Sequence, residues 1–142
     1  MGEMNPGRPF LADPPARLAE RSLHLTAEKI RRYGALTGDP NPIHYDAGFA
    51  ARTPYGKPIA HGTFTLNALW ASVTATFGAQ ALAGMAADLR FTKAVIENDT
   101  VTARGELVAR KPPTYRVFIL DSGGLPVVEG RLSWPGITRV GP

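Results

Sequence analysis

Pro58-Ile-Ala-His-Gly-Thr-Phe-Thr-Leu-Asn-Ala-Leu-Trp-Ala-Ser-Val-Thr-Ala-Thr-Phe77 is the stretch of sequence that decides the fold. It contains no Asp, Glu, Lys or Arg, and its large apolar residues recur at spacings of three and four, as on an α-helix: Leu66, Leu69, Trp70, Val73 and Phe77. Alanine fills many of the positions between them, so we expect most faces of this helix to be buried. A helix buried in this way requires the rest of the chain to surround it.

The composition is that of one globular domain rather than a membrane protein. The chain has 142 residues, of which 44% are hydrophobic and 20% charged, enough to bury a core. Six Ser, Thr or Asn residues between Thr63 and Thr76 argue against a membrane span. Cysteine is absent, which excludes disulfides and thiolate metal sites. Residues 1–10 contain no apolar signal core, so we expect a cytoplasmic protein.

The charge balance favours anionic partners without identifying them. The formal net charge is +4 and the pI is about 9.8. No run of Lys and Arg and no alternation of basic and aromatic residues is present, so we do not expect nucleic-acid binding. An acidic carrier or a phosphorylated cofactor would explain the charge equally well.

The first half of the sequence predicts a flexible arm, a strand and two helices. Residues 1–15 contain four prolines and form the expected arm, and residues 16–142 form a single domain. Residues 21–25 alternate as a strand does. Thr26 is a good cap for a helix over residues 27–37, which would bury Ile30, Tyr33 and Leu36, and Gly38 would end it. Asp46 would cap a short helix that reaches residue 52.

After residue 84 the apolar residues recur at every second position, which indicates strands. We expect four antiparallel strands, at about residues 87–92, 101–107, 115–119 and 128–134. Asp121-Ser-Gly-Gly124 is a strong hairpin signal between the last two. Together with the preceding strand and helices, this pattern predicts an α+β fold in which an antiparallel sheet wraps around the long helix.

The segment from Asp39 to His44 places a carboxylate, an amide and an imidazole on a loop stiffened by two prolines. A carboxylate and an imidazole can together polarise a water molecule, and free N–H groups near Gly62 could hold an oxyanion. This combination suggests chemistry on a carbonyl-conjugated substrate. Ordinary turn formation is the alternative, since Asp, Asn and Pro are common turn residues.

Two segments, Thr37-Gly-Asp-Pro-Asn-Pro-Ile-His-Tyr-Asp46 and Pro58-Ile-Ala-His-Gly62, together resemble the hydratase motif of the MaoC-like family. The resemblance implies a hot-dog fold and an (R)-specific enoyl-CoA hydratase or related dehydratase. It implies that Asp39 and His44 are the catalytic pair, that Asn41 helps to hold water or the site, and that the Gly62 N–H is the oxyanion donor. The implied reaction is the reversible syn addition of water to a trans-2-enoyl thioester.

The same resemblance implies the binding residues and partners. Ile59, His61, Leu66 and Trp70 are the expected substrate-binding residues, and no metal or redox cofactor is expected. For Trp70 the alternative is that its indole fills the core or a dimer interface. The partners would be an acyl-CoA or acyl-carrier-protein thioester and a second copy of the chain in a homodimer. The basic residues that would form a solvated sheet face, or meet coenzyme A phosphates, are Arg90, Arg104, Arg110 and Lys111.

Several alternatives stay open on the sequence. A hot-dog thioesterase and a non-catalytic acyl-thioester binding module are the two rival functions. His61 is expected to be structural more readily than catalytic, Tyr45 to serve packing, and His24 to lie on the surface. A metal on His44, Asp46 and His61 is disfavoured because Asp46 is better explained as a helix cap.

Overall fold

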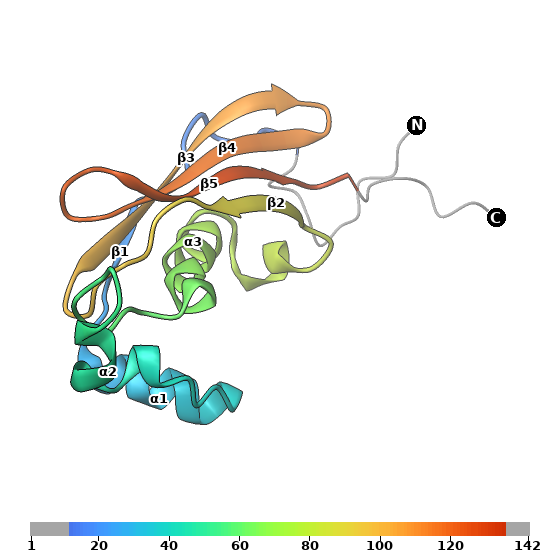
Figure 1. The fold of residues 1–142 in the computed structure, drawn as a ribbon. Helices are drawn as coiled ribbons and strands as arrows, with labels where there is room; N and C mark the ends of the chain where they lie inside the picture. The colour runs from blue at the N-terminus through green and yellow to red at the C-terminus, as the bar shows by residue number, and fades with distance from the viewer. Residues whose placement is uncertain (1–11, 136–142) are drawn as a thin grey trace.

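The computed structural model describes residues 12–135, which form one curved sheet, one long helix and several short helices (Figure 1). The helices are α1 (Ala27–Thr37), α2 (Ala47–Ala51), α3 (Gly62–Phe77) and the 3-10 turns η2 (Pro42–His44) and η3 (Ala79–Leu82). The strands are β1 (Arg21–His24), β2 (Ala86–Phe91), β3 (Thr100–Arg110), β4 (Pro113–Leu120) and β5 (Pro126–Ser133).

The sheet is antiparallel in the order β1-β3-β4-β5-β2, so that β1 and β2 are its edges. Figure 1 shows α3 lying along one face of the sheet. The alternation predicted for β3 and β4 is confirmed, because Val101, Ala103, Val117 and Ile119 are fully buried. The expected α+β arrangement, a sheet curved around one long helix, is therefore the fold of this chain.

Helix α3 has one buried side and one exposed side. Ala68, Leu69 and Val73 are almost fully buried against the sheet. Along the opposite side runs an exposed stripe at intervals of four residues: Thr63, Asn67, Ala71 and Ala75. The expectation that most faces would be buried is therefore wrong for this stripe, because a single five-stranded sheet covers only one side of a helix.

The polar residues on the buried side of α3 hold the chain segment before β1. The Ser72 hydroxyl donates to the carbonyl oxygen of Ala19, and the Ala19 N–H donates to Thr76 Oγ1 at 2.9 Å. Each buried hydroxyl thus has a partner, which avoids the cost of an unpaired polar group in the core. These bonds fix α3 against the β1 edge of the sheet.

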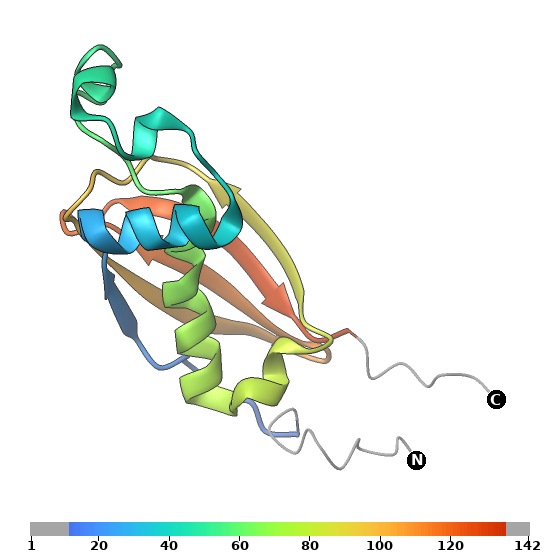
Figure 2. The ribbon, with the colours of Figure 1, turned by 90° about the horizontal axis from the view of Figure 1, so that it is seen from below.

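Helix α1 lies across the N-terminal end of α3 (Figure 2). Its predicted caps are confirmed: the Thr26 side chain accepts the Lys29 N–H, and Gly38 ends the helix with a left-handed φ of 70°. Ile30 is buried, but Leu36 is 86% exposed, so its predicted burial is wrong. Six residues advance an α-helix by about 600°, which turns Leu36 roughly 120° away from Ile30.

The N-terminal segment joins the fold before β1. Pro14 is buried, and the hydroxyl of the buried Tyr115 donates to the carbonyl oxygen of Pro15. Residues 1–11 of the predicted arm lie outside the described residues, so its boundary at residue 15 stays a prediction. His24 is exposed, as expected.

Candidate active site

The loop between α1 and η2 places the carboxylate of Asp39. The Asp39 N–H donates to the carbonyl oxygen of Gly34 at 3.0 Å. Its carboxylate oxygen Oδ1 accepts the backbone N–H of Asn41 at 3.1 Å, which leaves Oδ2 for other partners. The Asn41 side-chain oxygen accepts the Ile43 N–H at 3.1 Å and so caps η2. The Asn41 side chain therefore shapes the loop that carries the carboxylate.

His44 lies at the end of η2 with one ring nitrogen fixed by the backbone. Its Nδ1 lies 2.7 Å from the carbonyl oxygen of Ile59. Because a carbonyl can only accept, Nδ1 carries the proton, and in the neutral ring Nε2 carries the lone pair. That Nε2 lies 3.8 Å from Asp39 Oδ2. Two acceptor atoms thus face each other, and a water molecule can donate one proton to each.

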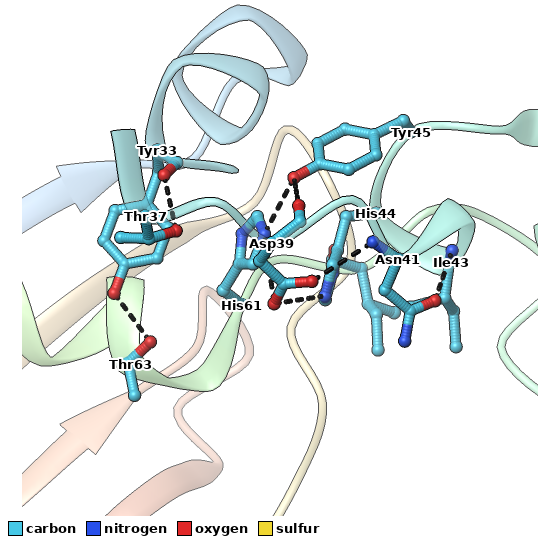
Figure 3. A network of polar contacts seen from close by, with 10 residues as sticks. Tyr33, Thr37, Asp39, Asn41, Ile43, His44, Tyr45, His61 and Thr63 are labelled. Carbon is cyan, nitrogen blue, oxygen red and sulfur yellow. Dashed lines mark hydrogen bonds and ion pairs between the residues drawn. The ribbon is translucent and has the colours of Figure 1, made fainter. Parts of the chain in front are cut away.

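His61 lies immediately before α3, and its imidazole ring stacks on that of His44. The imidazole rings of His44 and His61 have their centroids 3.7 Å apart at an interplanar angle of 27°. His61 is only 4% exposed, and its Nε2 lies 3.8 Å from Asp39 Oδ2 (Figure 3). Burial first, and then the neighbouring imidazole of His44, lower the pKa of His61, against the opposing effect of the Asp39 carboxylate. His61 is therefore a neutral neighbour of the pair.

Tyr45 determines which nitrogen of His61 carries the proton. The Tyr45 hydroxyl donates to the Asp39 carbonyl oxygen at 2.6 Å, and its oxygen lies 3.0 Å from His61 Nε2. A phenol has a single proton to donate, so in the second contact His61 Nε2–H is the donor. Nδ1 of His61 then holds the lone pair, and it has no hydrogen-bond partner among the described residues.

The start of α3 offers a free backbone donor. The N-cap of α3 is His61, and Gly62 is the first helical residue. No hydrogen bond within residues 12–135 uses the N–H of Gly62, and this residue is exposed. N–H groups at a helix start lack helical acceptors and lie at the positive end of the helix dipole. The Gly62 N–H can therefore stabilise negative charge on a bound oxygen atom.

A cavity of about 360 Å³ connects His44 with Gly62. Its lining also includes Ile59, as predicted for a binding residue. The sequence did not point to several other side chains that line it, among them Tyr55, Thr65, Phe91 and Lys93. The Ala60 N–H donates to the Val95 carbonyl oxygen at 2.8 Å, and an antiparallel bridge joins Ile59 to Ile96. These contacts hold the segment after Phe91 beside the start of α3, a placement that no local sequence pattern predicts.

Leu66 and Trp70 lie elsewhere on α3. Both are partly buried against the hydrophobic core and do not line the cavity beside His44. Their contact with an acyl chain stays a prediction. Three of the basic candidates form exposed ion pairs: Arg90 with Glu129, Arg104 with Glu20, and Arg110 with Asp13. Lys111 is also exposed, so these residues lie on a solvated surface.

The metal site considered from the sequence, made of His44, Asp46 and His61, is not found in the part of the chain that the structure describes. Asp46 accepts the Phe49 N–H and caps α2, as predicted, and the carboxylate beside the two histidines is that of Asp39. One ligand atom each from Asp39, His44 and His61 lies within 4.8 Å of the others. A cation there would displace the proton that His61 Nε2 donates to Tyr45 and move it to the unpartnered Nδ1. The donor set fits a hydrogen-bond network better than it fits a metal.

The comparisons with known proteins agree with this geometry. The MaoC like domain family matches residues 11–116. The (R)-specific enoyl-CoA hydratase of Aeromonas caviae is 33% identical over 124 residues, which cover 81% of this chain and 87% of that protein. The 3-hydroxybutyryl-CoA dehydratase of Methylorubrum extorquens is 30% identical over 92 residues, or 65% of this chain and 59% of that protein. The chain thus matches little more than half the length of this second relative.

The fold also has solved counterparts. The unliganded R-hydratase PhaJ1 from Pseudomonas aeruginosa superposes with a TM-score of 0.72 at 24% identity, covering 87% of this chain and 82% of that one. In residues 12–135, no helix is sufficiently long and apolar to cross a membrane. With its hot-dog arrangement of sheet and helix, the chain belongs to the MaoC-like domain family.

Proposed function

We propose that this chain catalyses the reversible addition of water to trans-2-enoyl thioesters, which gives (R)-3-hydroxyacyl thioesters. The observation that carries the proposal is the meeting of three groups. The Asp39 carboxylate and the His44 Nε2 lone pair lie 3.8 Å apart, and His44 shares its cavity with the Gly62 N–H. Relatives whose names describe hydratase and dehydratase activity support the same reaction.

The facing acceptors would hold and activate the water. A water molecule that donates to Asp39 Oδ2 and to His44 Nε2 has its oxygen lone pairs free for the substrate. As the water oxygen bonds to C3, one of its protons passes to the acid–base pair. A proton from the pair then passes to C2, and the former double-bond electrons form the new C2–H bond. The sum is the addition of one water, with both residues returned to their starting state.

The Gly62 N–H would act on the other end of the conjugated system. Attack at C3 pushes electrons onto the thioester oxygen, where a donor fixed in advance stabilises the enolate-like state. The cavity of about 360 Å³ would take the acyl chain next to this donor. The reaction changes no net oxidation state, so we propose no redox cofactor. We propose no metal because the His61 Nε2–H is already donated to Tyr45. The thioester carrier would be coenzyme A or an acyl carrier protein.

We further propose that the chain works as a homodimer in the cytoplasm. Strand β2 is an edge of the sheet, and Phe91 at its end is 50% exposed. An exposed edge carries unpaired N–H and C=O groups that a second copy can pair with. The exposed stripe of α3 offers further surface for the same contact. The compartment rests on the sequence expectation given above.

The test is a panel of enoyl-CoA substrates from crotonyl-CoA upward. Loss of the enoyl absorbance, an (R)-3-hydroxyacyl product and no free thiol are the expected results. Release of thiol would identify a thioesterase instead. Saturable binding of the enoyl-CoA without turnover would identify a binding module, and either result would overturn the proposal.

A further inference from the structure

Gly34 of α1 makes room for the Tyr45 hydroxyl. A Cβ atom at position 34 would lie 1.5 Å from the phenol oxygen and 2.6 Å from the ring carbon that bears it. Real Cβ atoms do not approach other atoms so closely, so any larger residue here would expel the phenol. Glycine costs up to about 1 kcal/mol relative to alanine inside a helix, and Gly34 is buried there. The space that Gly34 leaves is occupied by the hydroxyl group of Tyr45.

The main chain of Asp39 is held on both sides by this arrangement. The Gly34 carbonyl accepts the Asp39 N–H at 3.0 Å, and the Tyr45 hydroxyl donates to the Asp39 C=O at 2.6 Å. Tyr45 adjoins His44, so one short segment carries both the imidazole and the phenol. The same hydroxyl oxygen accepts His61 Nε2–H at 3.0 Å. Burial, and then the nearby Asp39 charge, raise the pKa of Tyr45, so the phenol keeps the proton it donates.

His61 also lies beside the Asp39 carboxylate. Its Nε2 lies 3.8 Å from Asp39 Oδ2, the oxygen that also faces His44 Nε2 at 3.8 Å. The two stacked imidazoles hold their protons on opposite atoms, Nδ1 in His44 and Nε2 in His61. The N–H of the neutral His61 therefore lies near the carboxylate oxygen but is donated to the Tyr45 hydroxyl.

We propose that Tyr45 and His61 are positioning residues for the Asp39–His44 pair, and that Gly34 is what admits Tyr45 to the site. Tyr45 fixes the backbone of Asp39 and holds the ring of His61, which stacks on His44, and together these contacts keep Oδ2 facing His44 Nε2. The kinetic part of this inference rests on the proposed hydratase function. Neither Tyr45 nor His61 exchanges a proton with the substrate.

The protonation pattern can be tested without any activity. Nitrogen-15 NMR of the histidine rings in the full chain at neutral pH should show His44 protonated on Nδ1 and His61 protonated on Nε2. In Tyr45→Phe the His61 resonances should shift because the acceptor of Nε2–H is gone. A His61 ring protonated on Nδ1, or on both nitrogens, would overturn the inference even if the enzyme is active.

The kinetic test separates positioning from general stability. Tyr45→Phe should lower kcat by about 10- to 100-fold with KM changed less than about threefold, because a misplaced catalytic group slows the chemical step. Gly34→Ala should cause a similar loss of kcat in the wild-type background. In a Tyr45→Leu background, which has no phenol to expel, Gly34→Ala should cause no further loss and should raise Tm.

Each outcome of these assays has a distinct meaning. An active wild type with unchanged kcat in Tyr45→Phe would contradict the positioning role. Equal losses from Gly34→Ala in both backgrounds would contradict its action through Tyr45. An inactive wild type would contradict the proposed function itself, and the NMR pattern would then decide the structural inference alone.

Discussion

The aromatic ring of Phe91 packs so closely against Gly62 that a Cβ atom at position 62 would lie 3.1 Å from two ring carbons. Phe91 is on the edge strand β2, and Gly62 is the first residue of α3. Both line the cavity that contains His44. The exposed aromatic ring of Phe91 thus forms one wall of the cavity beside the start of α3.

The role of the Gly62 N–H as an oxyanion donor can be tested by a substitution that removes this hydrogen-bond donor. Gly62→Pro should lower kcat by about 10²–10³, since it deletes the expected oxyanion donor. Proline is tolerated at the first position of a helix, and the His61 ψ of 133° suits a residue before proline. Gly62→Ala is the matched control, because it introduces the same contact with Phe91 but keeps the N–H. Equal kcat values in the two variants would exclude the oxyanion role.

Acyl-chain selection distinguishes two candidate pocket residues. Phe91 lines the cavity, so Phe91→Ala should shift kcat/KM toward longer enoyl thioesters, by up to about 0.8 kcal/mol for each additional buried CH₂. Trp70, predicted from the sequence as a pocket residue, packs against the core. If its role is structural, Trp70→Ala should lower Tm and reduce kcat/KM equally for short and long chains. A shift in chain length with Trp70→Ala alone would reverse this assignment.

The buried side of α3 should dominate the stability of the domain. Leu69 is fully buried, so Leu69→Ala should lower the free energy of unfolding by about 2–5 kcal/mol. Val73→Asp should cost more, because it buries an unpaired carboxylate. Asn67→Ala on the exposed stripe is the control and should change the free energy of unfolding by less than about 0.5 kcal/mol. Chemical denaturation would measure all three, and wild-type stability in both core variants would contradict this fold.

The Lys93–Asp121 ion pair ties the cavity wall to the β4–β5 turn. Hydrogen bonds from Lys93 and from the Leu125 N–H lower the pKa of Asp121. A lowered folded-state pKa means that the stabilisation is present above the unfolded value of about 4 and is lost as pH falls through the folded value. Asp121→Asn should therefore lower the free energy of unfolding by about 1–3 kcal/mol at pH 7. The deficit should shrink below pH 4, and a deficit independent of pH would contradict this explanation.

Local chemistry explains which parts of the structure could be predicted from the sequence. The period of α3 and the caps at Thr26, Gly38 and Asp46 depend on neighbouring residues, and all of them are found in the structure. The residues Asp39, His44 and Gly62 were found through a motif with two correctly spaced halves. In the structure Asp39 lies beside His44, and His44 and Gly62 line the same cavity. The catalytic roles of these residues stay predictions.

The parts that could not be predicted depend on contacts between distant segments. Tyr45 was expected only to pack, because nothing near it in the sequence shows that α1 brings a glycine against its hydroxyl. Phe91 and Lys93 lie far from Gly62 in the sequence, and they reach the cavity because residues 95–97 bond to the backbone of the segment before α3. The predicted burial of Leu36 is wrong because residues three apart, such as Ile30, Tyr33 and Leu36, shift progressively around an α-helix. Helix α1 also has only a narrow contact with α3, so it buries few of its residues.

The central claim is that Asp39 and His44 act together on one water molecule, and a double-mutant cycle on enoyl-thioester hydration tests it most directly. Asp39→Ala and His44→Ala should each lower kcat by about 10²–10⁴. The double variant should be hardly slower than the worse single variant, because either change removes the function of the pair. Near-wild-type hydration in both single variants, measured beside an active wild type, would contradict the account, and so would losses that multiply in the double variant.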